Sequence, residues 1–440
     1  MSVALVTLCV ATASAATEKV IYSFQAGTDG AYPLAALVAD ANGHLYGTTQ
    51  GGGTGACKVA PPPGGCGTVF ELAPPAAAGE AWVESVIYRF TGGGDGANPW
   101  AGLIFDQSGN LYGTAEFGGQ SENGVVFELT PPPTTGGAWS ETVLYAFKGH
   151  RHGDGANPQA GLVFDSHGNL FGTTYAGGIP CSDSAPSGCG TIFELTPPTA
   201  PGGAWTEQLI YKFDPSFAGG PASVLVLDAS GNLYGTAVND GALGEGTAYK
   251  LSPSGSAWTR TVLHTFGGSG DGGYVYAGLI FGKGGNLYGA TTGFGGQVGN
   301  GGTVFELARP TTGTAWKETL LTVFPGENGV TEGPWSSLLS SKAGALYGAT
   351  SSGGGGDCVT SGGWHGCGFV FQLTPPAAPG SAWTETTLYS FQGSPDGAVP
   401  YSGLAFGFGH RIYGTTSAGG SGTCFQNGLS GCGTVFEIVP

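Results

Sequence analysis

A tandem repeat runs through the chain and limits the folds open to it more than any other feature. The motif Leu-Tyr-Gly-Thr, or a close variant of it, recurs seven times, with its aromatic residue at Tyr46, Tyr112, Phe171, Tyr234, Tyr288, Tyr347 and Tyr413. The mean period is about 61 residues. Such units bury their hydrophobic faces by packing against their neighbours. We therefore expect one repetitive architecture.

Each unit is predicted to form four short β-strands. In the second unit the runs are 101–106, 111–114, 126–129 and 139–147. They are rich in β-branched and aromatic residues and are bounded by glycine, proline and asparagine, which is typical of strands. No helical period is present in the sequence. Four-stranded units repeated at this spacing predict the blades of a β-propeller.

The two ends of the sequence indicate how the ring closes. The last unit stops after its third strand, at Pro440, while residues 17–24 match the fourth strand of another unit, residues 206–213. The first strand would therefore complete the seventh blade. We predict an all-β protein, a seven-bladed propeller with four antiparallel strands per blade, forming a single domain over 16–440.

Glycine accounts for 87 of the 440 residues, a content that without a repeat would indicate disorder. Three positions of the unit are glycine in all seven copies. One of them, for example Gly47, lies inside the second strand. A glycine there predicts the close approach of another backbone or of an aromatic ring from the next unit. The glycine content thus follows from the fold.

The charge and the N-terminus bear on location and partners. A formal net charge of −17 argues against nucleic acid and against anionic membranes as partners. No apolar run is long enough for a membrane helix. Residues 1–15 are apolar and end in Ala13-Ser14-Ala15, which predicts a signal peptide. We expect a secreted or cell-surface protein that is monomeric.

Eight of the nine cysteines support export. Cys9 lies in the predicted signal peptide, and the others form close pairs in the loop between the second and third strands of a unit, the 2–3 loop. A zinc site would need four converging ligands, which two cysteines per loop do not supply. We predict four disulfides and neither a metal nor a cofactor. The pairs are Cys57–Cys66, Cys181–Cys189, Cys358–Cys367 and Cys424–Cys432.

One position differs between the units in an informative way. It follows the 4–1 loop, which leads from the fourth strand of one unit to the first strand of the next. Its residues are Leu34, Trp100, Gln159, Ala222, Tyr276, Trp335 and Tyr401. Four of them are aromatic, and the 4–1 loops also carry Asp-Gly turns. We predict a binding site for sugar or peptide made of Trp100, Tyr276, Trp335, Tyr401, Asp95, Asp154, Asp271 and Asp396. The alternative is that these rings only pack between blades.

No catalytic residues are predicted, because most acidic residues recur with the repeat. The residues that break the pattern include Glu116 and Glu122 in one 2–3 loop, and His150-Arg151-His152 in a 4–1 loop. A polysaccharide hydrolase or lyase would need Glu116, His150 or Glu332 to converge. Solvated loop residues are the simpler interpretation.

The units at 45–70 and 412–436, with Leu-Tyr-Gly-Thr-Thr or Ile-Tyr-Gly-Thr-Thr followed by Gly-Thr-Val-Phe, resemble the GloVer tandem repeats of bacterial choice-of-anchor proteins. The resemblance covers 17–440. It implies an exported bacterial protein and supplies no catalytic residues. The function we expect is a non-catalytic binding or scaffold module for an extracellular glycan or protein. The alternatives are a polysaccharide-active enzyme and a purely structural surface component.

Overall fold

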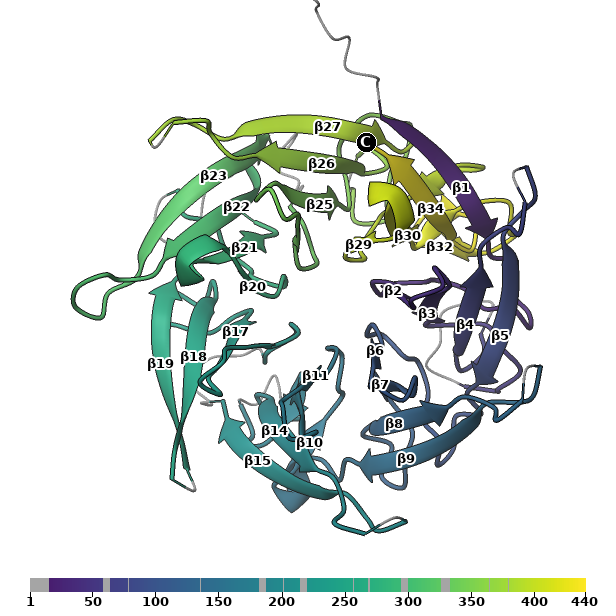
Figure 1. Ribbon diagram of the computed structural model, residues 1–440, viewed down its shortest axis with the longest axis horizontal. Helices are drawn as coiled ribbons and strands as arrows, with labels where there is room; N and C mark the ends of the chain where they lie inside the picture. The colour runs from purple at the N-terminus through teal and green to yellow at the C-terminus, as the bar shows by residue number, and fades with distance from the viewer. Residues whose placement is uncertain are drawn as a thin grey trace, which may run out of the picture.

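Seven four-stranded sheets stand around a central axis like the blades of a propeller (Figure 1). The computed structural model describes residues 16–57, 64–77, 79–134, 136–181, 187–200, 202–213, 220–255, 257–267, 270–293, 300–325, 333–363, 365–378 and 380–440. Every pairing inside these sheets is antiparallel. The predicted all-β, seven-bladed architecture is confirmed.

The blades follow one another along the chain. The strands of each blade are given below from the innermost to the outermost. Blade 1 holds β2 (Val38–Ala39), β3 (Leu45–Thr49), β4 (Thr68–Ala73) and β5 (Val83–Arg89). Blade 2 holds β6 (Ile104–Phe105), β7 (Leu111–Ala115), β8 (Val125–Thr130) and β9 (Ser140–Ala146). Blade 3 holds β11 (Val163–Phe164), β12 (Leu170–Thr174), β14 (Thr191–Thr196) and β15 (Thr206–Lys212).

The next three blades repeat this order. Blade 4 holds β16 (Val226–Leu227), β17 (Leu233–Ala237), β18 (Thr247–Ser254) and β19 (Ala257–Thr265). Blade 5 holds β20 (Ile280–Phe281), β21 (Leu287–Thr291), β22 (Asn300–Ala308) and β23 (Lys317–Pro325). Blade 6 holds β24 (Leu339–Ser340), β25 (Leu346–Thr350), β26 (Phe369–Thr374) and β27 (Thr384–Ser390).

Blade 7 combines strands from both ends of the chain. It holds β29 (Ala405–Phe406), β30 (Ile412–Thr416), β34 (Thr434–Val439) and, as its outer strand, β1 (Thr17–Ser23). Thr17 pairs with Val439 and Ser23 with Thr434. Figure 1 shows the purple β1 lying along the yellow β34.

The inner strands are shorter than the six-residue runs that the sequence predicts, because each pairs over two residues only. Residues that precede the inner strands accept hydrogen bonds from the neighbouring blade instead. The Thr48 hydroxyl donates to the Ala101 carbonyl over 3.0 Å, and the Thr114 hydroxyl to the Ala160 carbonyl over 3.1 Å. The segments around the axis are thus fixed by hydrogen bonds between blades, in addition to sheet pairing within each blade.

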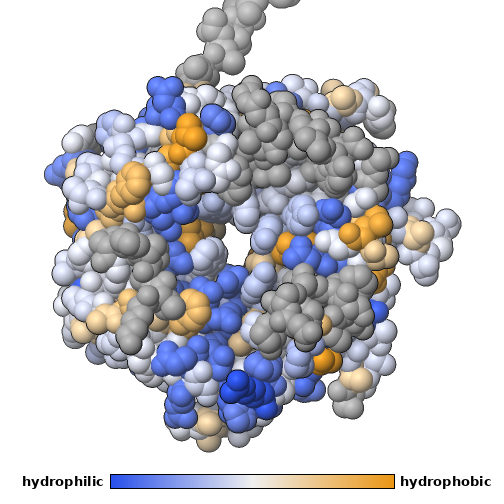
Figure 2. Space-filling view, turned by 180° about the vertical axis from the view of Figure 1, so that it is seen from behind, coloured by the Kyte–Doolittle hydropathy of each residue, from blue (hydrophilic) through white to orange (hydrophobic). Residues whose placement is uncertain are grey.

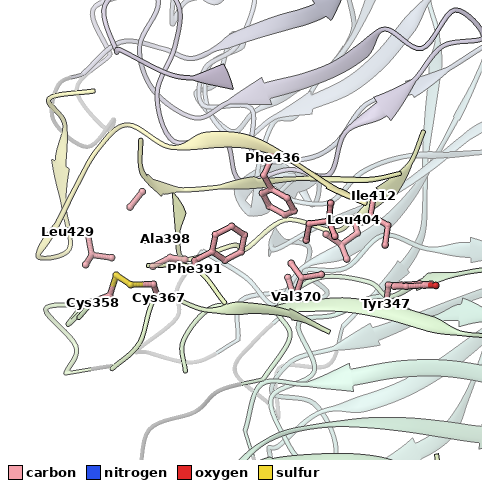
Figure 3. Packing of buried hydrophobic residues seen from close by; sticks show 14 of the residues in the cluster. Tyr347, Cys358, Cys367, Val370, Phe391, Ala398, Leu404, Ile412, Leu429 and Phe436 are labelled. Carbon is pink, nitrogen blue, oxygen red and sulfur yellow. A yellow bond between two sulfur atoms is a disulfide. The ribbon is translucent and has the colours of Figure 1, made fainter. Parts of the chain in front are cut away.

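The hydrophobic core lies between the blades. Each interface includes a pair of aromatic rings in which one ring comes from the end of an outer strand and the other from the third strand of the next blade. The pairs are Phe24–Phe70, Phe90–Phe127, Phe147–Phe193, Phe213–Tyr249, Phe266–Phe305, Phe324–Phe371 and Phe391–Phe436. Figure 3 shows the last pair between blades 6 and 7, with the Cys358–Cys367 disulfide at one end of the cluster.

The glycine inside the second strand makes room for a ring of its own blade. A Cβ atom on Gly47 would lie 2.6 Å from Cζ of Phe70 and 2.7 Å from Leu37. The close approach expected at this position is therefore present. The ring comes from the third strand of the same blade, however, and not from the next unit.

The remaining regular elements are small. They are the pairs β10 (Gly155–Ala156) with β13 (Ala176–Gly177), β28 (Gly397–Ala398) with β31 (Ala418–Gly419), and β32 (Phe425–Gln426) with β33 (Leu429–Ser430), and three 3-10 helices, η1 (His150–His152), η2 (Lys283–Gly285) and η3 (Phe408–His410). Among the described residues there is no α-helix, and hence no helix long and apolar enough to cross a membrane.

Candidate functional site

A cavity of about 430 Å³ lies at one mouth of the central channel. The seven positions at which the units differ all line it, namely Leu34, Trp100, Gln159, Ala222, Tyr276, Trp335 and Tyr401. Because these residues come from equivalent places in all seven blades, the cavity is centred on the propeller axis. Figure 2 shows the opening at the centre of the ring. The structure thus brings together the four aromatic residues that the sequence singled out.

Three of the four rings form a continuous arc over blades 5, 6 and 7. The Tyr276 ring stacks on Trp335 with centroids 4.5 Å apart and planes 30° apart. Tyr401 meets the same indole edge-on at 5.4 Å. All three side chains are half-buried. Burial raises the pKa of the Tyr401 hydroxyl to about 12, so it stays protonated and can donate a hydrogen bond.

Trp100 stands apart from this arc. It is 38% exposed, the highest value among the large hydrophobic residues of the cavity. No ring contact joins it to another aromatic residue in the described part of the chain. Its indole therefore presents a free face to the cavity.

Two disulfide-closed 2–3 loops form one wall. Thr360, Ser361 and Gly362 come from the loop of blade 6, and Gln426, Asn427 and Leu429 from the loop of blade 7. The Ser361 N–H donates to the Asn427 carbonyl over 2.7 Å and joins the two loops. Asn427 and Gly428 both have positive φ, as a two-residue hairpin turn between β32 and β33 requires.

All four predicted disulfides are present. Three of them also support the positions that line the cavity. The carbonyls of Cys66, Cys367 and Cys432 accept the N–H groups of Asn98, Val399 and Tyr32, at 2.8 to 2.9 Å. Each of these three acceptors is the second cysteine of its pair, and each donor lies two residues before a cavity position.

The backbone at these donors is in the left-handed region, with φ of 55° at Asn98, 58° at Val399 and 60° at Tyr32. A proline follows each of them. Non-glycine residues adopt this conformation only where their surroundings impose it. The hydrogen bonds to the cysteine carbonyls hold this conformation at the three residues, each of which lies two positions before a side chain that lines the cavity.

The polar groups of the cavity are uncharged. Gln50, Gln159, Gln426 and Asn427 contribute amides, and Thr360, Ser361 and Ser417 contribute hydroxyls. No lysine, arginine, histidine, aspartate or glutamate is among the described lining residues. Such a surface can stack on apolar faces and exchange hydrogen bonds with hydroxyl or amide groups.

Glu116 lies directly behind this surface. It is buried, and its Oε1 accepts a hydrogen bond from Nε2 of Gln159 over 2.8 Å. Burial raises the pKa of the Glu116 carboxyl, and the bond from Gln159 partly offsets that rise. Glu116 thus orients a lining amide. His150 lines a separate groove, so these two residues do not converge, and Glu332 lies outside the described residues.

The predicted aspartates are not in the cavity. Asp95, Asp154 and Asp396 accept hydrogen bonds from the hydroxyls of Tyr88, Tyr145 and Tyr389 on the outer strands, and from N–H groups of their own 4–1 loops. Asp271 accepts the N–H of Gly267, and its Oδ2 lies 3.3 Å from His264. These four residues therefore shape the outer part of the 4–1 loops, away from the aromatic residues.

A glutamate of the following blade faces the aspartate of each of five such loops. Burial raises the pKa of these glutamates to about 7, and the neighbouring aspartate adds to the rise; they are Glu18, Glu84, Glu141, Glu207 and Glu318. An Oε1 atom of each is buried without a hydrogen-bond partner. The sequence identified these acids as part of the repeat, but did not show that each faces a second carboxyl group.

Arg260 takes the place of this glutamate in blade 4. It forms an ion pair with Asp240, and its guanidinium lies 5.1 to 5.6 Å from the ring centres of Tyr211, Phe213 and Tyr249. Nothing in the repeat pattern explains a basic residue at this position. In the structure it packs against Tyr211, whose counterparts in four other blades donate a hydrogen bond to an aspartate; these are Tyr22, Tyr88, Tyr145 and Tyr389.

The fold and the site define a seven-bladed β-propeller built from tandem repeats, with a cavity at the axis. The chain belongs to the Gloeobacter/Verrucomicrobia repeat family, whose sequence profile matches residues 7–182 and 179–426. The resemblance seen in the repeats is thereby confirmed. No curated protein matches the sequence.

Solved structures match the chain at low sequence identity. A luciferin-regenerating enzyme is 14% identical with a TM-score of 0.42, over 77% of this chain and 90% of its own. The Trypanosoma rangeli sialidase is 8% identical with a TM-score of 0.43, over 97% and 60%. A gluconolactonase from Xanthomonas campestris is 14% identical with a TM-score of 0.40, over 76% and 86%. These likenesses are too distant to bear on function.

Proposed function

We propose that this protein is a binding module that takes an uncharged saccharide at the mouth of its central channel. The observation that carries the proposal is the position of Trp100, Tyr276, Trp335 and Tyr401. They occupy the place where the seven units differ, and all four line one cavity. A structural residue would be expected to recur with the repeat, whereas a recognition residue need not.

The chemistry of the cavity favours a sugar. Aromatic faces bury the C–H faces of a sugar ring, while amides and hydroxyls bond to its hydroxyl groups. The volume of about 430 Å³ lies in the range of small-molecule sites. A charged ligand would lose hydration there without finding a countercharge among the described lining residues, which is unfavourable. An uncharged ligand has no such cost.

We further propose that residues 1–15 are a signal peptide and that 16–440 form one exported, monomeric domain. Four disulfides are consistent with an extracellular location. Three of them, through the carbonyls of Cys66, Cys367 and Cys432, also help to hold the cavity in its binding shape before the ligand arrives, which reduces the entropy lost on binding.

An array of neutral saccharides, acidic saccharides and peptides, probed with the purified chain, tests the proposal. We expect binding to neutral saccharides, weakened about tenfold or more by Trp100→Ala, a loss of about 1.4 kcal/mol. Phe408→Ala is the matched control, because Phe408 is 68% exposed and does not line the cavity. Binding confined to peptides, or equal affinity of the Trp100→Ala variant, would contradict the proposal.

A further inference from the structure

The 4–1 loop between blades 2 and 3 departs from the repeat. The phenylalanine that ends the outer strand and the loop aspartate are five residues apart in four other loops, but Phe147 and Asp154 are seven residues apart. The longer loop contains His150-Arg151-His152, which form η1. An insertion present in one copy is not required by the propeller architecture, so it is a place to look for a separate function.

The insertion forms one side of a groove of about 360 Å³. Lys148, Gly149 and the three residues of η1 line this side, and Ser121 and Asn123 from the 2–3 loop of blade 2 line the other. Lys148, Arg151 and His152 are exposed, and His150 is half-buried. The groove shares no lining residue with the cavity on the axis.

Positive charge is concentrated here on an acidic protein. The whole chain has 13 lysines and arginines against 30 acids, yet Lys148 and Arg151 stand three residues apart beside two imidazoles. A third cation, Lys212 of β15, donates from Nζ to the carbonyl of Gly153 over 2.7 Å. That bond fixes the end of the insertion.

No aspartate or glutamate is among the described residues that line the groove. Asp154 is buried, and its oxygens accept from the Tyr145 hydroxyl at 2.9 Å, the Lys148 N–H at 2.8 Å and the Gly155 N–H at 2.6 Å. Glu207 stands beside it with its pKa raised to about 7, chiefly by burial and then by Asp154, while Lys148 and Lys212 partly offset the rise. Glu122 is exposed next to the groove but does not line it.

We propose that the groove of Ser121, Asn123 and 148–152 binds an oxyanion, a carboxylate, sulfate or phosphate group carried by a small ligand. Arg151 and Lys148 supply charge-assisted hydrogen bonds, and Ser121 and Asn123 supply neutral donors opposite them. A small ligand fits better than a long polyanion, because the rest of the chain is acidic and repels extended negative charge. This site is independent of the saccharide cavity.

Calorimetric titration of the full chain at low ionic strength tests the proposal, with inorganic sulfate, inorganic phosphate, glucuronate and uncharged glucose as probes. The groove variant is Lys148→Gln with Arg151→Gln. The control, Lys283→Gln with Lys342→Gln, removes the same charge from two exposed positions outside the groove. All four side chains are exposed, so we expect both variants to fold.

We expect at least one anion to bind, with about tenfold weaker affinity in the groove variant and unchanged affinity in the control. The ranking of the three anions identifies the group that is recognised. Three results would each overturn the proposal. They are no binding of any anion, an equal loss in both variants, and a loss of glucose affinity in the groove variant as large as its loss of anion affinity.

Discussion

The backbone N–H of Ser361 donates to the carbonyl of Asn427 over 2.7 Å, which joins the 2–3 loops of blades 6 and 7. A Cβ on Gly428 would lie 3.0 Å from the carbonyl oxygen of Val359, so the two loops also touch at the hairpin turn. Each loop is closed by its own disulfide. The wall of the cavity therefore depends on the disulfide within each loop and on the contacts that join the two loops.

Removing the disulfide of blade 7 should impair binding more than removing that of blade 3. Each joins two cysteines that are 8 residues apart in the sequence, so Cys424→Ser with Cys432→Ser and Cys181→Ser with Cys189→Ser should each cost about 2–3 kcal/mol of stability. The 2–3 loop of blade 7 lines the cavity, whereas no described residue of the 2–3 loop of blade 3 does. Thermal unfolding and saccharide binding of both variants check this. Equal loss of affinity would contradict the role of the wall in binding.

Trp335 and Trp100 should respond differently to substitution by alanine. Trp335 loses its ring contacts with Tyr276 and Tyr401, each worth about 0.5–1.5 kcal/mol. Trp100 has no such contact with the described residues, so its loss should change the free energy of unfolding by less than about 0.5 kcal/mol. Denaturant unfolding of the two variants measures both values. A large destabilisation by Trp100→Ala would show that its indole serves packing.

Glu141→Gln should stabilise the propeller at high pH and have little effect at low pH. The pKa of Glu141 is raised from 4.5 to about 7, chiefly by burial and then by Asp95. At a pH below the pKa of Glu141 in the unfolded chain, this carboxyl group is protonated in both the folded and the unfolded state. As the pH rises toward 7, the unfolded chain releases its proton first, so the stability contributed by this group is lost. The amide avoids that loss.

The gain at about pH 8 should be at most about 1 kcal/mol, because the group is partly exposed and solvent screens it. Melting temperatures at about pH 5 and pH 8 check it. Glu385→Gln is the matched control, since Glu385 occupies the same strand position but is exposed, accepts a hydrogen bond from Thr322, and follows a loop that has Asn328 in place of the aspartate. The same gain in both variants would show that neither burial nor the facing aspartate is the cause.

Arg260→Ala should be among the most destabilising single substitutions. The side chains of Arg260 and Asp240 are 14% and 9% exposed, so the change leaves a buried carboxylate without its partner. Loss of one member of such a pair costs about 3–5 kcal/mol. Lys250→Ala is the comparison, because that lysine only lies over the Tyr234 ring, at 5.9 Å, a contact worth about 0.5–1 kcal/mol. Similar free energies of unfolding for the two variants would argue against this account.

Periodicity made the architecture predictable. The seven-fold motifs predicted the blades, the cysteine pairs predicted the disulfides, and the variable position before each inner strand lines the cavity in the structure. Equivalent positions in the seven blades lie at the same distance from the propeller axis. Once the repeats are aligned, the position that lines the cavity is therefore known for all seven blades.

The roles of the aspartates could not be obtained in that way. Asp95 lies beside the aromatic residues in the sequence, but its carboxylate bonds to Tyr88 on the outer strand and faces Glu141 of the next blade. Contacts between blades depend on side-chain direction, which the repeat does not encode. The wall of blades 6 and 7 was missed for another reason. It arises from loop residues unique to those two blades, although the Asn427-Gly428 dipeptide is a hairpin signal that could have been recognised.

The most direct test of a saccharide site on the axis is the indole N–H signal of Trp100 in a nitrogen-15 NMR spectrum, assigned with a Trp100→Phe variant and followed while a neutral oligosaccharide is added. We predict that this signal shifts saturably, with the same dissociation constant that calorimetry gives. A bound oligosaccharide that leaves the Trp100 signal in place while other indole signals move would contradict it.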